Sequence, residues 1–134
     1  MRILHLINYY QPKIGYQEYF LAQKQKELGH EVFLITSNRY FPFKNYKVSY
    51  QPLLGKRKHE SGKFDEEGIL VYRVKPLIEI VVPFFKNAFL ILSGIKEILN
   101  EISPDLIICH GTTIPLSLQL AKAKFDCSRP YIIY

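Results

Sequence analysis

The first forty residues constrain the fold of this chain most strongly. An apolar run from Ile3 to Ile7 is followed by a turn that ends at Gly15, and then by a polar stretch that closes on Gly29 ahead of a second apolar run. Glycine suits both the turn into a helix and the left-handed position that ends one. The sequence therefore predicts a strand over residues 2–8, a helix over 15–28 and a second strand over 31–37.

The remaining chain continues to alternate between strand and helix patterns. Between Ala88 and Ile102, apolar residues recur at the 3.6-residue spacing of a helix. We predict, in order, a strand over 69–74, a helix over 87–102, a strand over 105–110, a helix over 113–125 and a strand over 130–134. Such alternation is typical of right-handed crossovers and a parallel sheet. The predicted fold class is α/β: a Rossmann-like, doubly wound parallel sheet with strand order 3-2-1-4-5, truncated within strand 5.

The composition fits a single domain with an uneven charge. A chain of 134 residues that is 48% hydrophobic can fill one core. The net charge is +6, and nine basic but only four acidic residues fall between 39 and 75. Residues 39–67 also lack a regular apolar pattern, so we predict a mobile basic insertion there. Two interpretations stay open: a solvated loop, or a patch that attracts phosphates or an anionic membrane surface.

The sequence lacks the signals of secreted, membrane-spanning and metal-binding proteins. Cys109 and Cys127 alone make no disulfide framework, which favours a reducing compartment. The N-terminal apolar run is shorter than the core of a signal peptide, and polar residues and Pro83 interrupt the longest apolar stretch, Leu77 to Leu92. The four histidines do not have metal-ligand spacing. We therefore predict a cytoplasmic protein without a bound metal.

The carboxyl ends of the first and fourth predicted strands mark the expected ligand crevice. In a doubly wound sheet, ligands bind where neighbouring crossovers diverge, and here that point lies between these two strands. Gly15 and Tyr16 open the first helix there, so their N–H groups are candidates to bind a phosphate, with Lys13 adding charge. His110 ends the fourth strand and is expected to face the same crevice. A purely structural role for the single-glycine turn stays open, because it matches neither a dinucleotide fingerprint nor a P-loop.

Three other reactive side chains receive structural interpretations. His5 lies within the first strand and is expected to be a buried residue with satisfied hydrogen bonds. Cys109 and His110 are adjacent on a strand and so point to opposite faces, which argues against a nucleophile–base pair. Glu18 lies one turn into the first helix and is expected to stabilise that helix through its dipole.

A set of short motifs spans nearly the whole chain apart from the basic segment. They are Ile3-Leu4-His5-Leu6, Tyr10-Gln11-Pro12 leading to Gly15, Glu18, Leu21-Ala22, Gly29-His30-Glu31-Val32 and Pro104-Asp105-Leu106-Ile107-Ile108-Cys109-His110. This set resembles the N-terminal domain of the family 4 retaining glycosyltransferases, which have the two-domain GT-B architecture.

The resemblance implies roles for particular residues. In that family, the glycine turn after the first strand approaches the donor diphosphate, a role that falls here on Gly15 and Tyr16. The histidine that ends the fourth strand lines the site near the transferred sugar, which makes His110 the catalytic candidate. Tyr16 stands where the family usually has a second glycine, and Ile108 where it often has another histidine. The expected acceptor contacts are Tyr9, Tyr10 and Arg39.

The resemblance also implies an activity and its partners. The intact protein is expected to move a sugar from a nucleotide-sugar donor to a glycan or lipid-linked acceptor, with retention of configuration and without a cofactor. The family's C-terminal domain, which holds most of the nucleotide, is not in this sequence. We therefore expect the chain to be the leading part of a longer enzyme, or a piece cut from one, and to be inactive alone.

Two further points stay open. Peripheral contact with the inner face of a membrane, through the basic segment and Pro83-Phe84-Phe85-Lys86, stands beside the simpler interpretation of scattered aromatic residues in a loop. The alternative function is a non-catalytic Rossmann-like binding or assembly domain that has lost donor binding. A dehydrogenase-like module is disfavoured because its glycine fingerprint is missing, and no nucleic acid partner is expected.

Overall fold

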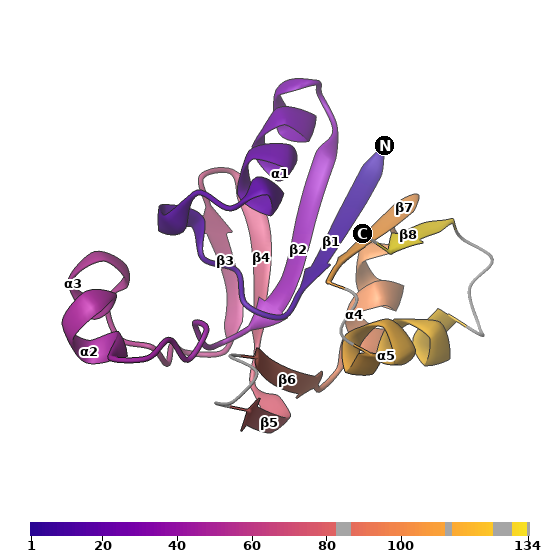
Figure 1. The fold of residues 1–134 in the computed structure, drawn as a ribbon. Helices are drawn as coiled ribbons and strands as arrows, with labels where there is room; N and C mark the ends of the chain where they lie inside the picture. Colours follow the sequence, from indigo (N-terminus) through magenta and orange to yellow (C-terminus); the bar gives the residue numbers. More distant parts are fainter. Residues whose placement is uncertain (83–86, 112–113, 125–129, 134) are drawn as a thin grey trace.

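The computed structural model describes residues 1–82, 87–111, 114–124 and 130–133 of the chain (Figure 1). Its elements, in chain order, are β1 (Arg2–Ile7), the 3-10 helix η1 (Pro12–Ile14), α1 (Gln17–Glu27), β2 (Glu31–Ser37), α2 (Tyr46–Ser49), α3 (Gln51–Leu54), β3 (Gly62–Glu66), β4 (Ile69–Val74), β5 (Pro76–Val82), β6 (Asn87–Leu92), α4 (Ile95–Ile102), β7 (Leu106–His110), α5 (Ile114–Lys124) and β8 (Tyr131–Ile133).

The central sheet of the described chain has six strands in the order β3-β4-β2-β1-β7-β8. β1 pairs in parallel with both β2 and β7, with Ile3 opposite Val32 on one side and Leu106 on the other. β4 and β8 extend the parallel sheet, whereas β3 pairs antiparallel with β4 at its edge. A second, antiparallel sheet consists of β5 and β6. The fold is thus α/β and broadly Rossmann-like. Its strand order differs from the predicted one, because β3 is added at the edge.

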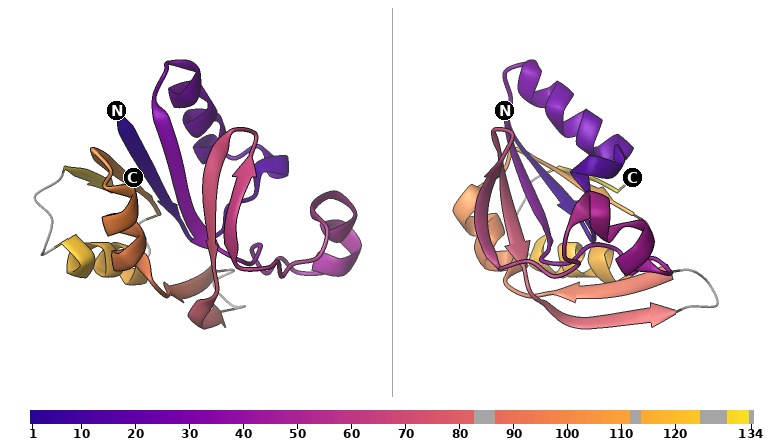
Figure 2. Two further views of the ribbon diagram at one scale, coloured as in Figure 1. Left: turned by 180° about the vertical axis from the view of Figure 1, so that it is seen from behind. Right: turned by 90° about the vertical axis from the view of Figure 1, so that its left-hand side faces the viewer.

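Helices cover both faces of the central sheet, as the right-hand view of Figure 2 shows for α1 and α4. On one face, Ala22 of α1 packs against apolar side chains of β1, β2 and β4. On the other face, α4, α5 and β6 enclose a larger core. Its fully buried members include Leu4, Leu6, Leu90, Leu92, Ile102, Ile107, Leu116 and Leu120. The inner strands β1, β2 and β7 are apolar almost throughout because both of their faces are buried.

The predicted helix over 87–102 is wrong in its first half. Residues 87–92 form β6, and only Ile95–Ile102 is helical, as α4. The apolar residues of the two elements together match a helical period, but Ala88, Leu90 and Leu92 are buried alternately, as in a strand. Gly94 separates the elements with a left-handed φ of 66°, a conformation that glycine adopts without steric cost.

Residues 39–67, predicted as a mobile basic insertion without a regular pattern, contain regular secondary structure. The helices α2 and α3 and the strand β3 lie within this range. The buried residues of a small cluster around the two helices are Tyr40, Tyr46 and Leu54. Beside them, Phe43 stacks on Tyr50 with ring centroids 4.0 Å apart. Aromatic packing therefore organises a segment that is too irregular to show an apolar period.

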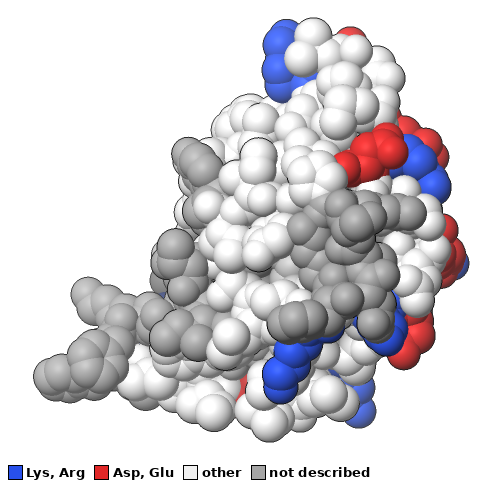
Figure 3. All heavy atoms as spheres, turned by 90° about the vertical axis from the view of Figure 1, so that its right-hand side faces the viewer, with Lys and Arg blue, Asp and Glu red and all other residues white. Residues whose placement is uncertain are grey.

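The surface on the side of α5 and β8 consists largely of uncharged residues (Figure 3). All three residues of β8 are exposed, although each is apolar or aromatic. No helix in the described ranges is long and apolar enough to cross a membrane. Residues 83–86, for which membrane contact was an open interpretation, lie outside the described residues.

Candidate functional site

A hollow of about 530 Å³ lies at the carboxyl ends of β1 and β7, where the sequence predicts the ligand crevice. The last residues of these strands, Ile7 and His110, are direct partners in the sheet. Aromatic and uncharged polar side chains make up most of the lining, which includes Asn8, Tyr9, Gln11, Tyr16, Gln17, Glu18, Phe41, Phe43 and His110. We call this site the His110 hollow.

A chain of hydrogen bonds fixes the ring of His110. His110 Nε2 lies 2.7 Å from His5 Nδ1, and the two ring planes are nearly parallel, at 13°, with centroids 5.0 Å apart. On the other side, His5 Nε2 lies 2.6 Å from Gln25 Oε1 of α1. His5 is fully buried and His110 is 8% exposed. The prediction that His5 is a buried residue with satisfied hydrogen bonds is confirmed.

These contacts determine where the protons of the two rings lie. The Gln25 amide oxygen can only accept, so His5 Nε2 carries a proton and donates it. In neutral His5, Nδ1 is then an acceptor, and His110 Nε2 must donate to it. Burial, with a smaller effect from His5, lowers the pKa of His110 to about 4. His110 therefore lines the hollow at neutral pH as an uncharged ring.

The turn that contains Gly15 and Tyr16 leads directly into α1. Gly15 has a left-handed φ of 75°, and its N–H donates to the carbonyl oxygen of Pro12 at 3.2 Å. That amide is thus used within the turn, contrary to the expectation that it faces a phosphate. Tyr16 precedes the first residue of α1 and is 40% exposed where it lines the hollow. Binding of a diphosphate at Gly15 and Tyr16 stays a prediction.

Of the three residues predicted to contact an acceptor, Tyr9 and Arg39 meet at the carboxylate of Glu79, whereas Tyr10 lies apart from them. Tyr9 lines the His110 hollow, and its hydroxyl donates to Glu79 Oε1 at 2.9 Å. Arg39 pairs with Glu79 Oε2, and Arg57 pairs with Glu79 Oε1. Tyr10 lies on the opposite side of its strand end, is 1% exposed and lines a different cavity. Of the three, Tyr9 alone reaches the hollow.

The contacts around Glu79 form a buried charge network. We define the Glu79 network as this carboxylate with Arg39, Arg57 and the Tyr9 hydroxyl. Burial alone raises the pKa of the Glu79 carboxyl, but the hydrogen bonds from Arg39 and Tyr9 and the charge of Arg57 lower it overall. The carboxylate therefore stays charged, and it ties β5 to the chain that follows β2.

Several residues of the hollow were not predicted as site residues. Burial raises the pKa of the Glu18 carboxyl above its usual range, so this group exchanges its proton closer to neutral pH. Gln11 Oε1 accepts a hydrogen bond from the Phe41 backbone N–H at 3.2 Å, and the Phe41 ring meets Tyr9 edge to face. The aromatic run at residues 40–43, directly after β2, is a sequence signal that could have indicated this wall of the hollow.

The lining favours a neutral, polyhydroxylated ligand. Aromatic faces can pack on the C–H groups of a sugar ring, and uncharged amides and the neutral imidazole can exchange hydrogen bonds with its hydroxyls. Within the described ranges, no group of three His, Cys, Asp or Glu side chains is placed to hold a metal ion.

Comparisons with known proteins give a limited result. No protein-family model matches the sequence, and no curated protein matches it. Among solved structures, the chain is similar to the C-terminal domain of a hydrogenase from Pyrococcus furiosus, with 16% sequence identity and a TM-score of 0.46. The similarity covers 98% of this chain and 89% of that one. At this level it carries no argument for a function.

Proposed function

We propose that this chain is the acceptor-side domain of a retaining glycosyltransferase of GT-B architecture, which transfers a sugar from a nucleotide-sugar donor to a glycan or lipid-linked acceptor. The observation that carries the proposal is the uncharged His110 ring, held by His5 and Gln25 in an aromatic-lined hollow at the carboxyl ends of β1 and β7. The motif resemblance supports the same function.

In this proposal each group has a role that its environment allows. His110 lines the hollow as an uncharged ring, because His5 fixes its proton on Nε2, and so it brings no charge beside the sugar. Tyr9 and Phe41 form an aromatic wall. Glu18, with its raised pKa, is the group of the hollow that can hold a proton near the reacting sugar. The diphosphate and nucleotide would be bound mainly by the second domain of the enzyme.

The test is a sugar-transfer assay on a protein that contains this chain, with radiolabelled nucleotide-sugars and glycolipid acceptors. His110→Ala should lower kcat/KM by about tenfold, as expected for the loss of one side-chain contact with the sugar in the transition state. Lys47→Ala, an exposed residue of α2, is the control and should leave the rate unchanged. Equal rates for His110→Ala and the unsubstituted protein, or no transfer from any nucleotide-sugar, would refute the proposal.

A second candidate function rests on the turn into α1. The Gly15 N–H is already bonded to Pro12, and Tyr16 places a side chain where a diphosphate would approach. These observations favour a non-catalytic domain that binds saccharides without the donor. Calorimetric titration of the full-length protein separates the two functions, because a protein whose domain has lost donor binding would bind an acceptor saccharide and show no heat with any nucleotide-sugar.

A further inference from the structure

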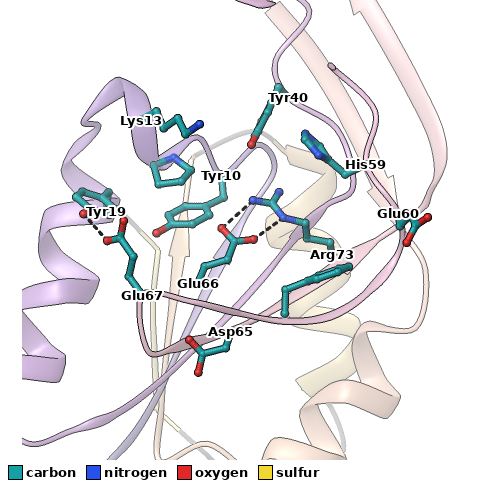
Figure 4. A pocket seen from close by; sticks show the side chains of 12 residues that line it. Tyr10, Lys13, Tyr19, Tyr40, His59, Glu60, Asp65, Glu66, Glu67 and Arg73 are labelled. Carbon is teal, nitrogen blue, oxygen red and sulfur yellow. Dashed lines mark hydrogen bonds and ion pairs between the residues drawn. The ribbon is translucent and has the colours of Figure 1, made fainter. Parts of the chain in front are cut away.

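A second cavity, of about 650 Å³, lies on the α1 side of the sheet. Its lining comes from four parts of the chain: the turn after β1, the start of α1, the segment around Tyr40 and His59, and the β3–β4 hairpin. Figure 4 shows Arg73 of β4 reaching into the middle of this group. We call it the Arg73 cavity. It is separate from the His110 hollow, because Tyr9 lines one site and Tyr10 the other.

Arg73 occupies a position where the fold would be expected to place an aliphatic side chain. It follows Ile69 and Val71 on the face of β4 that packs under α1, and it is 6% exposed. Glu66 of β3 accepts hydrogen bonds from Arg73 Nε at 2.7 Å and from Nη2 at 3.0 Å. This forked pair compensates the buried charge and fixes the plane of the guanidinium group.

The third guanidinium nitrogen has no such partner. Nη1 is buried, and no described residue accepts a hydrogen bond from it. Figure 4 shows it on the side away from Glu66, toward Tyr40 and His59. His59 Nε2, which lines the same cavity, is also buried without a partner in the described part of the chain. Buried polar atoms in native proteins are almost always satisfied by protein, ligand or ordered water, so these two atoms are available to bond a molecule in the cavity.

Both groups are held rigidly. The His59 backbone N–H donates to the Asn38 carbonyl oxygen at 2.8 Å, and Asn38 Nδ2 donates to the His59 carbonyl oxygen at 2.9 Å. The His59 ring contacts the Tyr40 ring edge to face, with centroids 4.3 Å apart. The Arg73 guanidinium carbon lies 5.6 Å from the centre of the Tyr40 ring. The two polar atoms are therefore positioned before any ligand arrives, which reduces the entropy lost on binding.

The charges of the lining select the ligand class. The lining includes two cations, Lys13 and Arg73, and four carboxylates, those of Glu60, Asp65, Glu66 and Glu67. A phosphate or carboxylate would add negative charge to an already acidic cavity, and a simple cation would be repelled by the positive charge of Arg73. A neutral ligand with several hydroxyls avoids both costs, because it accepts from Arg73 Nη1 and donates to the carboxylates. The rings of Tyr10 and Phe64 add faces for its C–H groups.

We propose that the Arg73 cavity is a second binding site, distinct from the His110 hollow, for a neutral sugar, either a free monosaccharide or the terminal residue of a glycan. Arg73 Nη1 and His59 Nε2 recognise its hydroxyls. The site does not depend on the function proposed for the hollow, because the two share no lining residue.

The test is an NMR titration of the ¹⁵N-labelled protein with glucose, galactose and mannose, with their methyl glycosides and disaccharides, and with the matching 6-phosphates. We expect at least one neutral sugar to shift the amide signals of Lys13, His59 and Phe64, and the 6-phosphate to bind more weakly. Stronger binding of the parent monosaccharide indicates a free sugar, and stronger binding of a disaccharide indicates the end of a glycan.

Variants identify the groups responsible. Arg73→Lys keeps the charge beside Glu66 but removes the forked guanidinium, and it should weaken binding about tenfold. Phe64→Ala, at the cavity rim, should also weaken it, while Val48→Ala, an exposed residue of α2, should not. His110→Ala should leave the shifts intact even if it abolishes transfer. The proposal is overturned if folded protein shows no neutral-sugar shifts, if 6-phosphates bind more tightly, or if Arg73→Lys and Phe64→Ala both bind as the parent does.

Discussion

The buried histidine pair makes the stability of this protein depend on pH above the range in which carboxylates titrate. An ordinary histidine binds its proton with a pKa of 6.5, whereas burial lowers the pKa of His110 to about 4. Between these values the unfolded chain binds more protons than the folded one, so the free energy of unfolding falls as the pH is lowered. Each pH unit below 6.5 costs about 1.4 kcal/mol, and the loss between pH 7.5 and pH 5 is about 2 kcal/mol.

The assay is urea unfolding followed by far-UV circular dichroism at pH 7.5, 6.5, 5.5 and 5.0. The His110→Gln variant removes the titrating ring but keeps an amide N–H that can donate to His5. Its free energy of unfolding should fall by about 2 kcal/mol less than that of the unsubstituted protein over the same range. Burial also lowers the pKa of His5, so some pH dependence should persist in the variant.

Two results would refute this reasoning. One is a free energy of unfolding that stays constant from pH 7.5 to 5, and the other is the same loss in His110→Gln as in the unsubstituted protein. The ¹⁵N shifts of the rings give an independent check. Both His5 and His110 should carry their proton on Nε2 at pH 7.5.

Three further predictions concern the supports of the two sites. Glu79→Ala should lower the free energy of unfolding by about 3 kcal/mol, because it leaves two half-buried arginines without their carboxylate. Glu79→Gln should lower this free energy by less, and urea unfolding measures both variants. Gly15→Ala should cost about 1 kcal/mol because the residue has a φ of 75°, whereas Gly15→Asn should cost less in the same assay. Cys109 is fully buried, and burial raises the pKa of its thiol to about 11. In a Cys127→Ser background, Cys109 should therefore react with iodoacetamide at pH 8 about a hundredfold more slowly than an ordinary thiol, which mass spectrometry can measure.

The inner strands could be predicted from sequence because their environment is simple. β1, β2 and β7 are buried on both faces, so each appears as an unbroken apolar run. The prediction of a helix at the position of β6 was wrong for a related reason. All of residues 88–92 are apolar, so the inward alternation of Ala88, Leu90 and Leu92 leaves no trace in the sequence. Tertiary packing, and the turn at Gly94, decide between strand and helix there.

The two candidate sites also differ in how far the sequence predicts them. The position of His110 at a strand end follows from the strand pattern. Its contact with His5, however, joins residues 105 positions apart in the sequence and depends on the register of β1 and β7. The Arg73 cavity could not be anticipated, because it needs β3. The sequence of β3, Gly62–Glu66, is polar and exposed, and a strand of this kind has no apolar period to reveal it.

The two borders of the central sheet would respond differently to a second copy of the chain. β3 carries the charged residues Lys63, Asp65 and Glu66, and charges on an edge strand discourage further strand pairing. β8, at the other border, offers Tyr131, Ile132 and Ile133, all exposed, on a largely uncharged surface (Figure 3). Self-association of the purified chain at high concentration should therefore begin at β8, and a lysine at position 132 should improve its solubility without touching either candidate site.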